Sequence, residues 1–281
     1  MLRRLFLIIV AILAVSLAAT NTFAGYPSRD SWLPIAGHVS GAADRVFYTT
    51  IYLTSVARKT NDVTLSFYPS AQPDVTPRAV KLQLAPNQTA AVDAGPQLVG
   101  EAGAIGAIDV HSSRNVIASC RIFSPPAPGA VFNAIPQQFA IGTRESTLLH
   151  VPSGGRYKLY AVETRGFPLY FSVMAEPGGN ERRLYLAAHE QRSWDLSELF
   201  AAMNVTALRV TGVNGSGKIV IAATFNSTTS QNFAAFEMSL PTQSPHRMRW
   251  PESLAYIAVA LAIIVAIAMR RGPRTEDRGL R

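Results

Sequence analysis

The residue types that carry catalysis or bind metals are few in this 281-residue chain and poorly placed for either role. Its five histidines are widely separated, and none belongs to an HExxH or similar zinc-binding arrangement. The single cysteine, Cys120, lies in the strand-like segment 117–123, where a small buried apolar side chain is favoured over a nucleophile. We therefore expect a protein that is not an enzyme and that has no cofactor, no metal and no catalytic residue.

Carboxylates offer the remaining route to chemistry, provided that the fold brings two of them together. A glycosidase needs two carboxyl groups roughly 5 to 9.5 Å apart in one groove. A polysaccharide-active cell-envelope enzyme is therefore the alternative hypothesis, with four candidate carboxylates: Asp93, Asp109, Glu163 and Asp195. For Asp93 and Asp195 we favour a structural role, because each follows a predicted strand and precedes a short helical segment. Asp195 and Glu198 have the spacing of a helix capping box.

A glycine-rich run at 214–218, Asn-Gly-Ser-Gly-Lys, has part of the pattern of a phosphate-binding loop. It lacks the full pattern, and no helix is predicted after it. The run lies between two strand-like segments, so we predict a hairpin turn there.

Aromatic and arginine side chains are dense between residues 156 and 194. Both types are favoured at protein interfaces. They define a candidate interaction surface of five residues: Tyr157, Tyr160, Tyr170, Arg182 and Arg183. The alternative is that the aromatic residues form a core and the arginines line the solvated face of a sheet. The apolar stretch 131–141 leaves a similar choice between an exposed docking segment and a packed one.

These residues belong to a body whose sequence pattern predicts strands. Segments 46–54, 63–68 and 79–84 are rich in β-branched and aromatic residues or alternate apolar with polar ones, and turn-forming residues separate them. Four blocks recur in the same order 100 to 110 residues later, which indicates an internal repeat. The paired blocks are 47–54 and 157–164, 63–69 and 169–177, 82–93 and 184–195, and 107–118 and 207–222.

This arrangement resembles the tandem β-sandwich units, immunoglobulin-like in a broad sense, of bacterial secreted and surface proteins. The fold class expected is all-β, with two tandem antiparallel β-sandwich units followed by one C-terminal transmembrane α-helix. The resemblance implies a role in adhesion, scaffolding or assembly, and it transfers no functional residue. We place the first unit at 25–124, a Pro-rich linker at 125–144 and the second unit at 145–240.

Residues 1–24 have the layout of a signal peptide. Two arginines precede a long apolar run, and Thr22 and Ala24 stand at positions −3 and −1 of a cleavage site. We expect cleavage after Ala24. Cleavage after Ala18 and an uncleaved membrane anchor are the alternatives.

Residues 254–269 are uncharged and apolar on all sides, which predicts a single transmembrane helix. Residues 241–253 form the juxtamembrane linker before it, and residues 270–281 form a basic tail on the cytoplasmic side, where arginines are favoured. Small residues on one face of the helix allow another helix to approach. The predicted anchor residues are Trp250, Leu254, Ala258, Ala262, Ala266, Arg270 and Arg271.

The net charge of +8 is concentrated at the two ends, since the N-terminal arginines and the tail contribute five of those charges. The body is nearly balanced, so we expect no nucleic-acid partner. A single cysteine in an exported β protein favours a bacterial envelope over a eukaryotic secretory route.

We therefore expect a single-pass protein of the bacterial cytoplasmic membrane, with its body in the periplasm or outside the cell and its C-terminus in the cytoplasm. The expected function is non-catalytic binding or scaffolding near the membrane surface. Its expected partners are the lipid bilayer and an envelope protein or membrane complex. An accessory subunit of a larger membrane complex is the alternative within this class, favoured by the alanine-rich helix face and the short tail.

Overall fold

The computed structural model describes residues 25–40, 46–73, 75–100, 103–125, 129–151, 155–200, 205–227 and 233–238. The chain divides into two compact units, Met1–Ser239 and Leu240–Arg281, and all described residues belong to the first. Strands predominate in them, and every pairing between their labelled strands is antiparallel, which confirms the predicted all-β class.

The predicted signal peptide and transmembrane helix lie outside the described residues. Among the residues that are described, no helix is long and apolar enough to cross a membrane. Helical structure in this part of the chain consists of three short turns, namely η2 (Gly95–Val99), η3 (Gln137–Phe139) and α2 (Leu196–Leu199).

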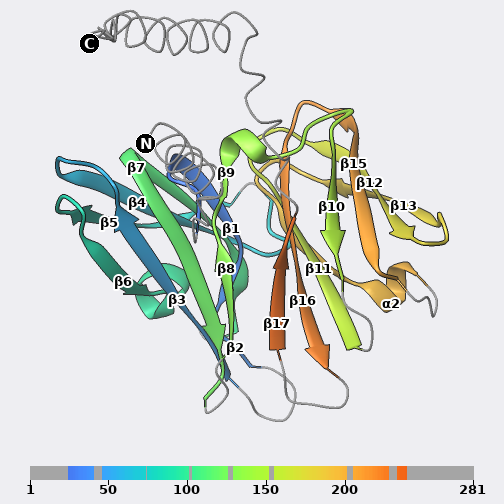
Figure 1. The fold of residues 1–281 in the computed structure, drawn as a ribbon, viewed down its shortest axis with the longest axis horizontal. Coiled ribbons are helices and arrows are strands. Elements are labelled where there is room, and N and C mark those ends of the chain that lie inside the picture. The colour runs from blue at the N-terminus through green and yellow to red at the C-terminus, as the bar shows by residue number, and fades with distance from the viewer. Residues whose placement is uncertain are drawn as a thin grey trace, which may run out of the picture. The chain divides into compact units, whose positions relative to one another are not determined.

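The N-terminal strand group, β1–β9, forms one hydrogen-bonded sheet (Figure 1). The bounds of its strands, in order, are Ser28–Gly37, Val39–Ser40, Val46–Ser55, Asn61–Pro69, Arg78–Leu84, Thr89–Asp93, Ile105–Phe123, Ala130–Asn133 and Ile135–Pro136. Strand β7 connects this sheet, because its first part pairs with β1 and β4 and its last part pairs with β3 and β8. One long bent strand therefore carries the chain from one set of partners to another.

The C-terminal strand group, β10–β17, forms two four-stranded sheets, in the orders β10-β15-β12-β13 and β14-β11-β16-β17. The bounds of β10 to β17, in order, are Ser146–His150, Gly155–Glu163, Leu169–Glu176, Glu181–Leu186, Gln191–Asp195, Ala207–Gly215, Ile219–Ser227 and Phe233–Glu237. Phe171 of β12 and Trp194 of β14 meet edge to face with ring centroids 5.9 Å apart. The two sheets therefore share apolar contacts between their facing sides.

The same pairing scheme occurs in both strand groups, in the order of the repeated sequence blocks. Strand β3 pairs with β6 and with the end of β7, as β11 pairs with β14 and β16. Strand β4 pairs with β5 and with the start of β7, as β12 pairs with β13 and β15. The flanking strands β1 and β8 have counterparts in β10 and β17.

The turns that precede β6 and β14 are also alike in atomic detail. In each turn the first backbone N–H donates to the side-chain oxygen of the fourth residue, at 2.7 Å for Gln88 and 2.8 Å for Glu190. The third residue has a positive φ in both cases, 57° at Asn87 and 52° at His189. A positive φ is uncommon for residues other than glycine, so its presence at both positions indicates a shared turn type.

The two groups differ at the corner where strand β7 corresponds to two strands. β7 is continuous through its bend, whereas the glycine-rich run at 214–218 separates β15 from β16. The predicted hairpin turn at this run is wrong, because β15 and β16 belong to different sheets. Asn-Gly between two strand-like segments is compatible with either arrangement, and the pairing partners of the strands decide between them.

The carboxylate of Glu163 holds the corner between β15 and β16. Its side chain is fully buried and accepts hydrogen bonds of 2.7 to 3.2 Å from five backbone N–H groups. Those donors come from three chain segments and belong to Arg165, Gly166, Phe167, His189 and Lys218. Charge-assisted bonds of this kind compensate for the loss of water around a buried carboxylate.

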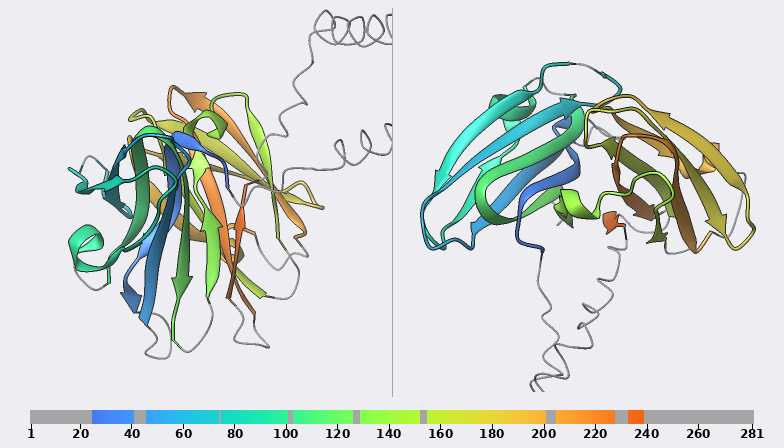
Figure 2. Two further views of the ribbon diagram at one scale, coloured as in Figure 1. Left: turned by 60° about the vertical axis from the view of Figure 1, so that its left-hand side comes forward. Right: turned by 90° about the horizontal axis from the view of Figure 1, so that it is seen from above.

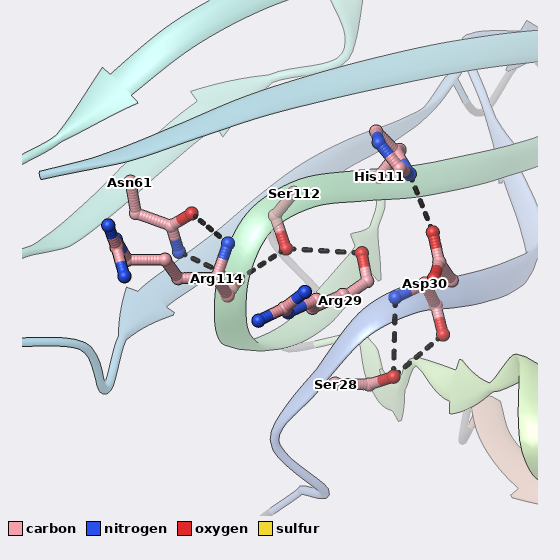
Figure 3. Close-up of polar contacts among 7 residues, drawn as sticks. All are labelled: Ser28, Arg29, Asp30, Asn61, His111, Ser112 and Arg114. Atoms are coloured by element: carbon pink, nitrogen blue, oxygen red, sulfur yellow. Dashed lines mark hydrogen bonds and ion pairs between the residues drawn. The ribbon is translucent and has the colours of Figure 1, made fainter.

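Asn61 has the corresponding role at the bend of β7 (Figure 3). Its side-chain oxygen accepts the N–H of Arg114 at 2.8 Å, and its amide donates to the Arg114 carbonyl at 3.0 Å. Ser112 Oγ donates to the carbonyl oxygens of Arg29 and Arg114. The fully buried Asn61 thereby fixes the backbone where β7 changes partners.

Strand β1 joins the two strand groups. All its residues from Ser31 to Gly37 are buried, unlike the alternating pattern of β4. Leu33 and Ile35 lie in the core of the N-terminal group, and the same buried cluster includes Tyr160 of β11. Strand β1 also contacts β16. A strand that is buried on both faces has a nearly continuous apolar sequence. We call the contact between the two groups, in which β1 packs on β11 and β16, the seam.

The segment that we interpreted as a linker takes part in the seam. Strand β8 pairs with β7 and lies beside β17, while β9 pairs with β1. Phe132 and Ile135 are buried, whereas Val131 is 59% exposed. The yellow-green turn η3 lies between the two groups (Figure 2). The apolar stretch 131–141 is thus packed at most of its positions.

Replacing Glu163 with Gln should destabilise the body strongly. The NH₂ group of the glutamine side chain would face backbone N–H donors that now bond to a carboxylate oxygen. Because donors cannot bond to each other, we expect the free energy of unfolding to fall by about 3 kcal/mol. Chemical unfolding of the purified chain measures this loss. Glu181→Gln, an exposed position on β13, is the control and should stay within about 0.5 kcal/mol of the parent. Equal stability of the two variants would contradict the role given to Glu163.

Candidate functional site

Three rings meet at the seam. The ring centroid of Trp32 on β1 lies 5.3 Å from that of Tyr68 on β4 and 6.4 Å from that of His189 in the turn before β14. Tyr68 and His189 are 5.2 Å apart. Trp32 is 3% exposed, so these rings and their neighbours exclude most water from the indole. The cluster joins side chains that are more than 100 positions apart in the sequence.

His189 is positioned through its backbone. Its N–H donates to Glu163 at 3.0 Å, and its φ of 52° turns the ring toward the N-terminal group. Within the described part of the chain, the buried Nδ1 atom has no hydrogen-bond partner. The contribution of this ring to the seam is therefore stacking on Trp32 and Tyr68.

Gln191, two residues further on, fixes the same turn to the N-terminal group. Its carbonyl oxygen accepts the backbone N–H of Ala71 at 2.8 Å. Its side-chain Nε2 donates to the carbonyl of Pro34 at 3.4 Å, and the residue is fully buried. Backbone and side chain of one residue thus contact both β1 and the turn that follows β4.

A charged cluster lies on the same side of the sheet as Trp32. Across the β1–β7 ladder Asp30 is opposite His111, and Trp32 is opposite Asp109. Residues that are opposite each other, or two apart along a strand, share one face. His111 Nδ1 lies 2.5 Å from Asp30 Oδ1, and the two side chains point toward each other (Figure 3). We call these residues the Asp30–Asp109–His111 cluster.

The three acids and bases of this cluster have different surroundings. Burial raises the pKa of the Asp109 carboxyl to about 6, while His111 opposes this shift and Asp30 adds to it. Burial also raises the pKa of the Tyr68 hydroxyl, with a contribution from the charge of Asp109. Asp30 and His111 are more open, with 53% and 65% of their side chains exposed.

This arrangement limits the chemistry of the cluster. A carboxyl group that titrates near pH 6 can donate or accept a proton under mild conditions. Among the described residues, no group of three or more His, Cys, Asp or Glu is arranged to hold a metal ion. The cluster is therefore suited to proton exchange or to recognition of a charged partner.

The structure distributes the five residues of the predicted interaction surface over different surroundings. Tyr160 is 7% exposed and belongs to the buried cluster at the seam. Tyr157 packs on Phe225, with ring centroids 5.0 Å apart. Arg182 reaches the end of α2, where its Nε donates to the Leu199 carbonyl at 2.9 Å.

Tyr170 alone among the predicted tyrosines is strongly exposed, and it has an aromatic neighbour. It is 47% exposed and lies opposite Tyr185 of β13, which is 39% exposed. Their ring centroids are 4.8 Å apart. Arg183 is also exposed and lies two residues before Tyr185 on the same strand. We call Tyr170 and Tyr185 the tyrosine pair.

The four candidate carboxylates serve separate local structures. Asp93 Oδ1 accepts the backbone N–H of Gly95 at 3.2 Å, which starts the turn η2. Asp195 is at the N-cap position of α2 but makes no capping hydrogen bond with its side chain, so the predicted capping box is not formed. Glu163 holds its corner, and Asp109 shares a cluster with other ionisable groups.

Sequence reasoning missed the seam residues of strand β1. Strand β1 precedes the first repeated block, so Asp30 and Trp32 had no repeat counterpart that would draw attention to them. The apolar run at 31–37 was the available signal for a strand buried on both faces. The predicted membrane-anchor residues, between positions 250 and 271, lie outside the described residues.

Comparisons with known proteins do not indicate a function for this site. No family model and no curated protein matches the chain. A solved structure, that of the protein Thermotoga maritima 1070, aligns with 39% of this chain and 95% of its own, at 10% identity and a TM-score of 0.33. At that TM-score the likeness has no weight for fold or function.

Replacing Asp109 with Asn should change how stability depends on pH. The unfolded carboxyl ionises near pH 3.8 and the folded one near pH 6, so wild-type stability falls as the pH rises through this window and stays lower above it. The effect reaches roughly 3 kcal/mol for a shift of about two units. Asp109→Asn should therefore gain stability over wild type between pH 4 and 7, as measured by chemical unfolding at each pH.

Asp62→Asn is the control for this experiment, because Asp62 is exposed on the neighbouring strand β4. Its difference from wild type should not follow the same curve. A constant difference between Asp109→Asn and wild type across pH 4 to 7 would contradict the raised pKa of the Asp109 carboxyl.

Proposed function

We propose that this protein is a membrane-anchored binding or scaffolding protein of the bacterial envelope and that it is not an enzyme. Its body works outside the cytoplasmic membrane, and its C-terminal helix and short tail hold it there. The partners are the lipid bilayer and an envelope protein or membrane complex. The export signal and the apolar segment 254–269 support this placement from the sequence.

The body is, in this proposal, a pair of tandem β-sandwich units, broadly immunoglobulin-like. The repeated pairing scheme supports it, as do the matching turns at Gln88 and Glu190. Units of this kind, in the proteins that the sequence resembles, present surfaces for adhesion or assembly.

The seam is the observation on which the scaffolding proposal rests. Strand β1 is buried on both faces, and the stack of Trp32, Tyr68 and His189 locks the turn before β14 onto the N-terminal group. Two units that share buried strands cannot swing about a linker without exposing apolar surface. A rigid pair holds its outer surfaces at a fixed spacing, which is what a scaffold requires.

The tyrosine pair is the surface that we propose for the protein partner. Large aromatic side chains on the outside of a soluble body lose little conformational entropy on binding and are frequent at the centre of interfaces. Arg183 beside the pair can add a charged hydrogen bond. Tyr170 and Tyr185 are two of the exposed large hydrophobic side chains in the described part of the chain.

Photo-cross-linking in living cells tests this surface. A benzophenone amino acid at position 170 or 185 should give a cross-linked protein product, because the partner covers the pair. The same residue at position 48, where Tyr48 is 37% exposed on the other strand group, is the matched control and should give none. Equal products at all three positions, or none at 170 and 185, would remove the proposed surface.

An enzyme acting on envelope polysaccharide is the second candidate, and the Asp30–Asp109–His111 cluster is the observation that favours it. One carboxyl with a pKa near 6 beside a second carboxyl is the pairing that acid–base hydrolysis uses. Incubation of the purified protein with peptidoglycan and neutral glycans, followed by measurement of new reducing ends, separates the two candidates. We expect no release. Release that Asp109→Asn abolishes and Asp62→Asn does not would establish the enzyme instead.

A further inference from the structure

A carboxylate at the end of strand β17 lacks a cation among the described ion pairs. Glu237 lies beside β8 and accepts hydrogen bonds from the backbone and the side chain of Asn133. The ion pairs formed by the described side chains do not include Glu237. Burial raises the pKa of its carboxyl, and the two bonds from Asn133 only partly oppose this shift. A positive charge nearby would stabilise the ionised form.

Gly25 lies near the same asparagine. It is buried, and a Cβ atom at this position would come within 2.7 Å of Ile117 Cγ2 and 3.7 Å of Asn133 Oδ1. Its φ of 135° is also one that glycine adopts readily and other residues do not. The next residue, Tyr26, packs edge to face on Phe139, with ring centroids 5.4 Å apart. The chain is thus held close to Asn133 before β1 begins.

The predicted signal-peptide cleavage changes the chemistry at Gly25. In a chain that continues from Ala24, the nitrogen of Gly25 belongs to a neutral amide. Hydrolysis of the Ala24–Gly25 bond by a signal peptidase consumes one water and leaves a carboxylate on Ala24 and an ammonium group on Gly25. The ordinary pKa of such a group is about 7.7 to 8.0, so it is mostly positive at neutral pH.

We propose that the ammonium group of Gly25, created by processing, forms an ion pair with Glu237. Asn133 donates its backbone N–H to Glu237, and its Oδ1 lies 3.7 Å from the place where a Cβ on Gly25 would stand, so both residues are near the same side chain. The pair joins the first residue of the mature chain to β17, the last strand among the described residues. The inference rests on the proposed export of the body, and it adds that processing itself stabilises the fold.

The proposed pair would satisfy two needs at once. An ammonium group at the buried Gly25 needs a counter-ion, because an unpaired charge in a dry setting is costly. A half-buried carboxylate without a cation has the complementary need. Cleavage after Ala18, the alternative site, would leave residues 19–24 attached and place no charge at Gly25.

A double-mutant cycle on the full chain tests the ion pair. The variants are Glu237→Gln, an insertion of Gly-Ser between Ala24 and Gly25 that displaces the new terminus, and the combination. Each single change should lower the thermal midpoint of the detergent-solubilised protein by about 3 °C. The combination should be no less stable than either single variant. Additive losses would overturn the proposal, as would no loss in either single variant.

The pH dependence distinguishes an ion pair from a packing effect. Because the carboxylate raises the pKa of the ammonium group in the folded state, its stabilisation is complete below about pH 8 and is lost as the pH rises through the folded-state pKa. The midpoint difference between wild type and Glu237→Gln should therefore shrink from pH 7 to pH 10. The exposed control Glu181→Gln should show no such change, and a difference for Glu237→Gln that persists at pH 10 would overturn the ion pair.

Two further measurements keep this inference separate from the proposed function. Mass spectrometry of the protein from bacterial membranes should find Gly25 at the N-terminus, and another terminus would overturn the ion pair alone. Protease digestion of spheroplasts should degrade the body from outside. A protected body would overturn export, and with it both the proposed function and the processing step.

Discussion

The burial of strand β1 on both faces is the constraint on which the rest of the body depends. One face completes the core of the N-terminal strand group through Leu33 and Ile35, and the same strand contacts β11 and β16 of the C-terminal group. Removing β1 would expose apolar surface in both groups at once, so neither can adjust independently. Both a hydrogen bond and a ring stack attach the C-terminal group to this strand. Gln191 bonds the Pro34 carbonyl, and the Trp32 indole is covered by Tyr68 and His189. The seam is thus part of the hydrophobic core and not a contact between two finished surfaces.

Much of the architecture could be predicted from local sequence, because alternation and turn chemistry act over short distances. Segments 46–54 and 63–68 lie in β3 and β4, and the repeated blocks correspond to equivalent strands.

The sequence-based predictions failed where strand pairing between distant segments determines the structure. The run at 214–218 has the sequence of a hairpin turn, yet its flanking strands find partners in different sheets. Tyr160 is of the same residue type as the exposed Tyr170, and its place in the buried cluster with Leu33 and Ile35 of β1 is not visible in the local sequence. The charged cluster escaped for the same reason, since Asp30 and His111 are 81 positions apart and meet only through the β1–β7 register.

The two strand groups solve one structural problem with different side chains. Each must turn a chain from one sheet direction to another at the same point of the pairing scheme. The N-terminal group keeps β7 continuous and fixes its bend with the neutral amide of Asn61, which offers both a donor and an acceptor. The C-terminal group breaks the strand and gathers five N–H groups on the carboxylate of Glu163, which can only accept. A broken strand leaves more unpaired backbone donors than a bent one, so an acceptor with two charged oxygens suits it better.

The same comparison explains why Tyr68 and Asp109 of the N-terminal group differ from their counterparts in the C-terminal group. In the N-terminal group Tyr68 is opposite Ala107, and Asp109 lies two residues after Ala107. In the C-terminal group Glu176 is opposite Ala207, and Arg209 lies two residues after Ala207. In the N-terminal group the turn at His189 covers this face, and the pair consists of the Tyr68 ring and the Asp109 carboxyl, whose pKa is raised. On the equivalent face of the C-terminal group, Glu176 and Arg209 form an ion pair of 2.7 Å between partly exposed side chains.

An ion pair tolerates water, whereas a ring stack is stabilised when water is excluded. Asn87, the counterpart of His189, is likewise exposed on its own turn. The equivalent positions therefore diverged according to which of them became buried between the groups.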